Sequence, residues 1–340
     1  MVIKKMINLL KKIFITFILF VYSSNLYSNE AGFNDWLNNF KKVSKNFGIS
    51  DKTISLTFSN IKFLPKVIEY DRYQPEFYED TFTYIKKRAN KSKTNKGVKI
   101  YNQNKFFIEK IEKEFSVEKE LLISLMGIET NFGTYLGKMD IISSLATLSF
   151  DKRRSEFFTR ELLTLLKLVD EGKVNTNILY GSWAGAVGNF QFMPSTIKNY
   201  AIDYDKNTVI ELKKFKDSYA SASNYLKKIG WKINEPCYYK IKLKEDVPKK
   251  YLNNSARELK NKKKLKYFKK YLINPENITD DDNLNVAIIT PDIDIVKNIT
   301  NKLEPAYIVF DNYELILKWT RSLRFALAVC TLKDKIKNEI

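Results

Sequence analysis

One carboxylate interrupts an otherwise apolar helical segment. Residues 121–129 read LLISLMGIE, and Glu129 follows Leu125 by four positions and Leu122 by seven. Positions with this spacing share one face of a helix, so Glu129 is predicted to project from the buried stripe. A charged carboxylate is costly there, so we expect its pKa to rise and the group to stay protonated. A protonated carboxyl group is what general-acid catalysis at a glycosidic oxygen requires.

The same pattern also fits a structural role for Glu129. A buried Arg such as Arg153 could neutralise it, because structural ion pairs perturb pKa values as catalytic sites do. Gly133 follows closely and predicts a helix end, which would leave the carboxyl group at the end of the helix beside a cleft. The residues alone leave both interpretations open.

A second segment combines small, aromatic and polar residues. Residues 181–195 read GSWAGAVGNFQFMPS. Small residues let the backbone approach a ligand closely, and Phe192 offers an aromatic face for the apolar side of a sugar ring. Ser182 and Gln191 could hydrogen-bond the polar groups of that ring, and Pro194 suits the first turn of a helix. The alternative is a tightly packed helix pair that requires small residues.

The composition excludes several kinds of chemistry. The chain contains no histidine, which rules out a Ser-His-Asp triad, a Cys-His pair and any His-ligated zinc or iron site. Acid–base catalysis must then come from carboxylates, Lys or Tyr. The formal charge of +19 indicates an anionic partner or simply a lysine-rich solvated surface. Cys237 and Cys330 form no CxxC motif; they could form one disulfide in an oxidising compartment, but we expect two separate buried thiols.

The elements around these segments are predicted mainly as helices. Short helices are expected over residues 31–100, with a core stripe at Phe33, Trp36, Leu37 and Phe40, and a polar loop over residues 90–99. Further helices are predicted over 117–129 and 162–169, and a single one from about Tyr313 to the end. Residues 238–244, 285–289 and 306–310 show strand patterns.

The first residues have the features of a secretory signal. Four lysines precede the apolar run IFITFILFVY of residues 13–22, and a polar stretch follows. We place cleavage near Ser28, with Ser24 as a rival site and an uncleaved N-terminal anchor as the alternative. Residues 1–28 carry four Lys and no acids, so the mature chain would have a charge of +19 − 4 = +15.

Several separate motifs, in one order, resemble the membrane-bound lytic murein transglycosylase B family of bacterial peptidoglycan-cleaving enzymes. The resemblance extends from about Gly32 to Lys333. The motifs that carry it are DRYQPEF at 71–77, IETNFG at 128–133, ATLSF at 146–150, Arg153-Arg154 with Phe158, residues 181–195, and residues 311–329.

The family implies a mainly α fold with a lysozyme-like α+β core. On that basis we divide the chain into a signal peptide at 1–28, an N-terminal helical region at 29–100, the catalytic core at 101–235, a small β-containing lobe at 236–310, and a C-terminal helix at 311–340 that returns to the core. A soluble, monomeric, periplasmic enzyme is expected. Its partners would be glycan strands and cell-wall synthesis or remodelling proteins, without nucleic acid.

The family also implies roles for individual residues. Its catalytic acid corresponds to Glu129. Its substrate contacts correspond to Ser182, Gln191, Tyr225, Arg153 and Arg154. Where the family pattern carries an Asn and an aromatic hydroxyl near the C-terminus, this chain has Thr320 and Phe325.

The implied reaction needs one acid and no cofactor. Glu129 would protonate the oxygen that leaves N-acetylmuramic acid, and then accept the proton of the C6 hydroxyl as a 1,6-anhydro ring closes. A hydrolytic muramidase is the nearest alternative and would need a second carboxylate, for which Asp140 and Asp151 are the nearest candidates. The other alternative is an inactive wall-binding or scaffold protein, which the departures at Thr320 and Phe325 would favour.

The resemblance further implies an EF-hand-like calcium site. Oxygen ligands would come from Asp203, Asp205, Asn207, Val209 and Asp217. Thr208 stands where the turn glycine is expected, and Lys206 adds a positive charge. An ordinary acidic turn is the alternative.

Overall fold

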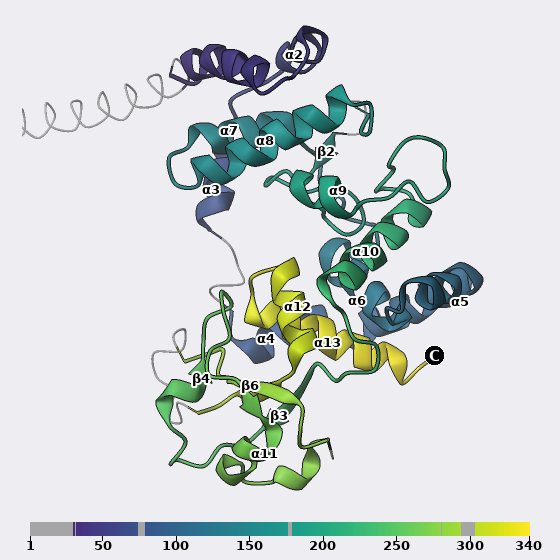
Figure 1. Cartoon of the computed structure of the whole chain (residues 1–340), viewed down its shortest axis with the longest axis vertical. Coiled ribbons are helices and arrows are strands. Elements are labelled where there is room, and N and C mark those ends of the chain that lie inside the picture. Colours follow the sequence, from purple (N-terminus) through teal and green to yellow (C-terminus); the bar gives the residue numbers. More distant parts are fainter. Residues whose placement is uncertain (1–29, 31, 74–78, 176–178, 280, 294–302) are drawn as a thin grey trace, which may run out of the picture. The chain divides into compact units, whose positions relative to one another are not determined.

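The computed structural model describes residues 30, 32–73, 79–175, 179–279, 281–293 and 303–340. These residues are mainly helical, as predicted, and Figure 1 shows how few of them lie in strands. The chain divides into two compact units, each built from separated stretches of sequence. Unit 1 comprises Met1–Asp71 and Met139–Gly185, and unit 2 comprises Arg72–Lys138 and Ala186–Ile340. The predicted five-segment division has other boundaries and stays a prediction.

Unit 1 is a helical unit with an aromatic core. It contains a helix over residues 32–46, followed by α2 (Asp51–Phe58), α3 (Pro65–Arg72), α7 (Ile141–Phe150) and α8 (Ser155–Asp170). The predicted stripe is buried as expected, since Phe33 packs against Trp36, Phe63 and Phe150. The short strands β1 (Met139–Asp140) and β2 (Tyr180–Gly181) pair antiparallel, and α7 packs against α8.

Helix α2 is connected to the end of α8 through one carboxylate. Asp170 accepts hydrogen bonds from the Ser50 and Thr53 hydroxyls, with Thr53 Oγ1 at 2.7 Å. These two hydroxyls, Ser50 first, hold the pKa of Asp170 at about 2 against an ordinary value of 3.8. The contact joins residues more than 100 positions apart.

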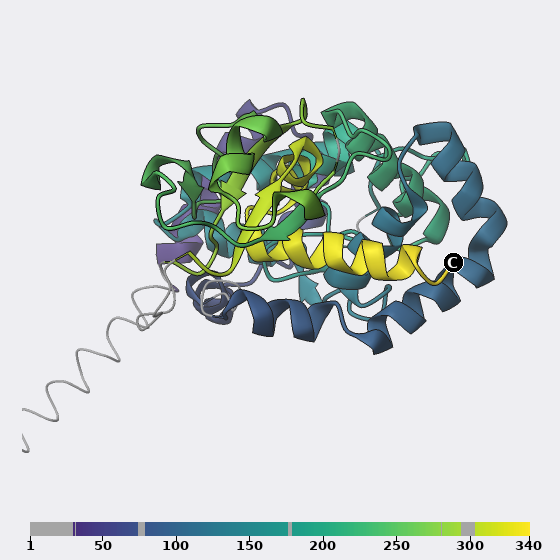
Figure 2. The same ribbon diagram turned by 90° about the horizontal axis from the view of Figure 1, so that it is seen from below.

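Unit 2 contains the helix that carries Glu129 and further helices before and after it in the sequence. They are α4 (Thr81–Arg88), α5 (Lys91–Phe115), α6 (Lys119–Thr130), α9 (Pro194–Tyr200), α10 (Phe215–Ile229), α12 (Asp311–Trp319) and α13 (Leu323–Lys337). Helix α13 contacts α4, α5, α6 and α12, and Figure 2 shows it as the long yellow helix ending at the C-terminus. Residues distant in sequence therefore share one helical core.

A small sheet lies in the same unit. Its strands are β3 (Tyr238–Ile241), β4 (Leu252–Asn253), β5 (Lys263–Lys264), β6 (Asn285–Ile289) and β7 (Ala306–Val309). The order is β3-β7-β6-β4, with β5 also paired to β6; only the β4–β6 pair is parallel. The predicted strands at 285–289 and 306–310 are thus confirmed, and that at 238–244 ends as a regular strand at Ile241.

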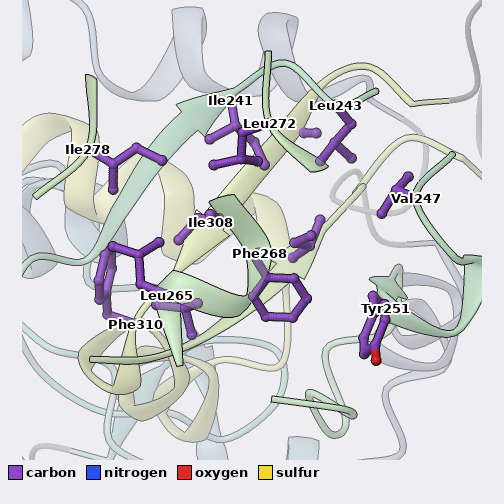
Figure 3. Close-up of a cluster of buried hydrophobic side chains, with 13 residues drawn as sticks. Ile241, Leu243, Val247, Tyr251, Leu265, Phe268, Leu272, Ile278, Ile308 and Phe310 are labelled. Carbon is purple, nitrogen blue, oxygen red and sulfur yellow. The ribbon is translucent and has the colours of Figure 1, made fainter. Parts of the chain in front are cut away.

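One face of the sheet has its own hydrophobic core. Ile241 and Ile308 from the strands meet Leu265 and Phe268 of α11 (Leu265–Phe268), as Figure 3 shows. The single-turn helices η3 (Lys249–Tyr251), η4 (Lys269–Tyr271) and η5 (Pro275–Asn277) complete the connections.

The helix predicted over 117–129 is confirmed as α6, which ends at Thr130 because Asn131, ahead of Gly133, already adopts φ +50°. Two local predictions were wrong. Residues 91–99 are the start of α5 and not a loop, because Asn90 caps that helix by accepting from Lys93 N at 2.9 Å. The predicted single C-terminal helix is two helices, and Ser322 caps the second by accepting from Phe325 N at 3.2 Å.

The two cysteines are joined. Cys237, just before β3, forms a disulfide with Cys330 of α13 across 93 positions of sequence. The expectation of two separate thiols was therefore wrong. Spacing along the chain carried no information on this contact, which depends on α13 packing beside the sheet.

Candidate functional site

Glu129 lies in the last turn of α6 and is half-buried. Its neighbour Thr130 is fully buried and donates its hydroxyl to Asn189 O at 2.9 Å, which fastens the end of α6 to the 187–192 turn. The chain then turns sharply through Asn131, Phe132 and Gly133, all with positive φ. The carboxyl group is thus neither deep in the core nor freely solvated.

Trp319 holds one oxygen of that carboxyl group. Its indole Nε1 donates to Glu129 Oε1 at 3.0 Å across 190 positions of sequence. Trp319 is the last residue of α12. Sequence reasoning assigned it only to the apolar stripe of the C-terminal helix and missed this contact. The only available signal was an aromatic residue with a polar N–H in a family motif.

Aromatic side chains fix the position of Trp319. Tyr225 of α10 stacks on it with ring centroids 5.0 Å apart, and Phe192 meets it edge-on at 5.4 Å. The Tyr225 hydroxyl donates to Lys318 O at 3.2 Å, and burial raises the pKa of Tyr225 to about 12. The structure therefore brings two of the predicted substrate contacts, Tyr225 and Phe192, next to Trp319 and through it to Glu129.

Gln191 belongs to a tight turn in the same unit. Val187 and Phe192 form an antiparallel bridge, and Gln191 between them adopts φ +52°. Its side-chain Nε2 donates to Gly188 O at 2.9 Å. Gly188 has φ +79°, and a Cβ there would lie 2.3 Å from Leu212 O, so this turn requires glycine. The small residues of this segment thus serve a close backbone approach and not a helix pair.

Ser182 lies in unit 1, directly after β2, and is half-buried. Its carbonyl accepts from Gly185 N at 3.1 Å, and the adjacent Trp183 packs against Tyr70. Gly185, the last residue of this turn, adopts φ +90°, and its backbone packs directly against the side chain of Leu145.

Arg153 and Arg154 both bind Asp71, which is buried in unit 1. Arg153 Nε donates to Asp71 Oδ2 at 2.7 Å, and Arg154 also lies 4.7 Å from the ring centre of Phe158. Two guanidinium groups face one buried carboxylate, so the cluster of Arg153, Arg154 and Asp71 has a net positive charge. Each guanidinium keeps more than a third of its side chain exposed, at 44% and 37%. Arg153 thus pairs with Asp71 within unit 1.

The possible second carboxylates have other positions. Asp140 caps α7 by accepting from Ser143 N at 2.6 Å, and Asp151 follows the end of the same helix. Both belong to unit 1, whereas Glu129 belongs to unit 2.

The loop at 203–217 gathers three carboxylates. Asp203, Asp205 and Asp217 each bring an oxygen within 4.8 Å of the other two. Asp217 is buried and accepts from Tyr204 N and Glu211 N, both at 2.9 Å. Thr208 adopts φ +77°, the conformation for which a glycine is preferred. Clustered carboxylate oxygens on a tight loop fit a hard cation such as calcium.

Comparison with known proteins agrees with this fold and site. The chain matches the family model described as the transglycosylase SLT domain over residues 32–334, so it belongs to that family. This confirms the resemblance predicted from the sequence. Among curated proteins, the membrane-bound lytic murein transglycosylase B of Escherichia coli K12 is 37% identical over 149 residues, or 44% of this chain. The match spans 41% of that relative.

Solved structures extend the likeness to most of the chain. SltB3 from Pseudomonas aeruginosa, in complex with NAG-anhNAM-pentapeptide, superposes with a TM-score of 0.78 and 29% identity over 90% of this chain and 79% of that one. The lytic transglycosylase Slt35 of Escherichia coli, in complex with calcium, gives a TM-score of 0.72 at 23% identity over 92% and 94%. The lysozyme-like fold class is thereby confirmed.

The predicted signal sequence lies outside the described residues. Across the part of the chain that the structure describes, no helix combines the length and the apolar character needed to cross a bilayer.

Proposed function

We propose that this protein is a lytic transglycosylase that cleaves the β-1,4 bond between N-acetylmuramic acid and N-acetylglucosamine in peptidoglycan. The observation that carries the proposal is the half-buried Glu129 at the end of α6, with Oε1 held by Trp319, in a chain of the transglycosylase SLT domain family. The complex of SltB3 with NAG-anhNAM-pentapeptide supports this substrate class.

The hydrogen bond from Trp319 favours one arrangement of the acid proton. An indole N–H donates and cannot accept, so Oε1 is the accepting oxygen and the proton belongs on Oε2. Oε2 then protonates the glycosidic oxygen as the bond to C1 breaks, and the substrate's acetamido oxygen stabilises C1. The C6 hydroxyl oxygen bonds to C1 while its proton returns to Glu129. One carboxyl group serves both steps and ends as it began.

The other predicted site residues are proposed as substrate contacts. Tyr225, Phe192 and Gln191 lie in the same unit as Glu129, and the first two pack on Trp319. Ser182, Arg153 and Arg154 belong to unit 1. The Arg pair keeps a net positive charge beside Asp71, which suits the carboxylates of peptidoglycan.

Two further features complete the proposal. The lysine-rich start with its short apolar run supports export to the periplasm as a soluble, monomeric enzyme. Asp203, Asp205 and Asp217, with Asn207 and the Val209 carbonyl, are proposed to hold a structural calcium ion. That ion would hold the loop together and would take no part in the reaction.

The decisive experiment is digestion of purified peptidoglycan by residues 29–340, with Glu129→Gln beside it, followed by mass spectrometry of the products. We expect 1,6-anhydro-muropeptides from the native chain and at least about a 100-fold lower yield from the variant, since it loses its general acid. Reducing-end products would instead indicate a hydrolase with a second carboxylate. Retained glycan binding without any product would indicate the inactive wall-binding protein.

A further inference from the structure

One edge of the sheet in unit 2 is open. Strand β3 lies at the end of the order β3-β7-β6-β4. Beyond it, Ile273 N donates to Lys242 O at 3.0 Å and Lys244 N donates to Tyr271 O at 2.9 Å, so residues 271–273 cover the outer edge from Lys242 onward. Because backbone groups alternate along a strand, Tyr238 and Lys240 face the same outer edge.

Pairing with the 271–273 segment does not extend to Tyr238 and Lys240, and the reason is a proline. Leu243 is opposite Leu272, so in this register Lys240 would be opposite Pro275, which has no N–H to donate. Within the described residues, the outward backbone groups of Tyr238 and Lys240 have no hydrogen-bond partner. Two N–H and two C=O groups are therefore available to another chain.

A cavity of about 720 Å³ borders this edge. Its apolar lining includes Ile241 of β3, Ile85 of α4 and Tyr307 of β7. Phe82 of α4 also lines the cavity and exposes 72% of its surface. The edge thus adjoins a space large enough for side chains of an added strand.

The charges around the cavity are mainly positive. Lys86, Lys240, Lys242 and Lys335 line it. Of the acids there, Asp80 caps α4 through Thr83 N, and Asp292 binds both Thr81 and Arg324. Glu304 is the third acid, so four lysines face three acids, of which Asp292 is already neutralised by Arg324. This balance favours an anionic occupant.

We propose that the open edge of β3 and the adjoining cavity bind an extended acidic segment of a partner protein by strand addition. Main-chain hydrogen bonds to Tyr238 and Lys240 would align the segment. Because side chains alternate along a strand, every second side chain of the segment would lie on the face that carries Lys240 and Lys242, where acidic residues would meet these lysines. The apolar residues between them would lie on the opposite face, beside Tyr239 and Ile241. The chain's own first 28 residues carry lysines and no acids, so they do not match this surface. The proposal is independent of the glycan-cleaving activity.

The test uses residues 29–340 and fluorescent eight-residue peptides in a polarisation titration. The first probe alternates Val and Asp, the second alternates Val and Lys, and the third is the first with every second backbone nitrogen methylated. We expect only the Val–Asp peptide to bind, with an affinity that falls as salt rises. Loss on methylation would show that backbone pairing is needed.

Matched charge reversals locate the surface. K240E with K242E should weaken binding by at least about tenfold. K263E with K264E, on β5 of the same sheet, should change it by less than about twofold. Glycan cleavage should be unaffected by either double change.

Four results would overturn the proposal. They are absence of binding by the Val–Asp peptide at millimolar concentration, equal binding of the Val–Lys peptide, binding that survives methylation, and equal loss from both double reversals. The first would mean that the lysines only protect the edge from aggregation. Binding of free peptidoglycan stem peptide in place of the Val–Asp peptide would reassign the surface to the cell wall.

Discussion

The carboxyl group of Glu129, the candidate acid, is held by one hydrogen bond from an indole N–H. Trp319 contacts Glu129 through one hydrogen bond and is held by Tyr225, Phe192 and Phe190 on its other sides. Aromatic packing makes the donor rigid, so the orientation of the carboxyl group is set before substrate binds. We therefore expect Trp319 to influence the proposed catalysis through Glu129.

Trp319→Phe should separate this role from packing. The variant keeps an aromatic ring against Tyr225 and loses only the N–H. Glu129 becomes a carboxylate as it gives up its proton, and a hydrogen bond to a charged group contributes about 1.5–3 kcal/mol, so we expect kcat to fall by about 10- to 100-fold with little change in KM. Steady-state assays on soluble peptidoglycan fragments would measure both constants.

Trp231→Phe is the matched control for that change. Trp231 donates its indole N–H to Glu118, which is buried, so this variant should lose stability but keep kcat. A Trp319→Phe enzyme with native kcat would show that the contact with Glu129 is not used in the reaction.

At the scale of elements, the 203–217 loop brings three carboxylates together, which is the basis of the proposed calcium site. Asp203, Asp205 and Asp217 converge, and Lys206 beside them is exposed. With calcium present, Asp205→Ala should lower the melting temperature by several degrees, because one ligand is lost. In chelator the two proteins should melt together. Asp246→Ala, an exposed Asp elsewhere in the unit, serves as the control. An equal loss with and without calcium would favour the ordinary acidic turn.

The junction between α2 and α8 predicts a pH dependence. The pKa of Asp170 is about 2 in the folded protein, below the ordinary 3.8, because Ser50 and Thr53 donate to the charged form. A lowered pKa stabilises the fold fully above the unfolded value, and that contribution is lost as pH falls from about 4 to about 2. Asp170→Asn should therefore lower the melting temperature at pH 7 and converge with the native protein near pH 2.

Thermal melts across this pH range would check the junction. Asp51 also lies in α2 and forms an exposed ion pair with Lys45. Asp51→Asn, which removes that ion pair, should have a much smaller effect at pH 7. A constant difference between Asp170→Asn and the native protein at every pH would contradict the assigned cause.

At the scale of the whole molecule, the disulfide connects the sheet to the last helix. Cys237 precedes β3 and Cys330 lies in α13, which packs on α4, α5 and α6. Closing so long a loop restricts the unfolded chain, so Cys237→Ala with Cys330→Ala should lower the free energy of unfolding by about 2–5 kcal/mol. Denaturant titrations in oxidising buffer would measure this. In reducing buffer the native and variant chains should have similar stability, and a difference that persists there would point to lost packing.

The family, the fold class and the candidate acid could be predicted from the sequence. A run such as 121–129 has only one polar side chain that could act as an acid on its apolar face, and the absence of histidine removed the competing chemistries. The strands at 285–289 and 306–309 were equally readable, because local patterns of apolar residues are recorded along the chain. The ends of helices were harder to predict from the sequence. At Asn90 and at Ser322 a single capping side chain begins a helix at a position that the local sequence pattern did not indicate.

The contacts between residues distant in sequence became known only from the three-dimensional structure. Trp319 meets Glu129 across 190 positions, Arg153 and Arg154 converge on Asp71, and Cys237 meets Cys330. The open edge of β3 likewise depends on which strand lies at the end of the sheet. Such contacts follow from the packing of whole elements against one another, and no short stretch of sequence contains both partners.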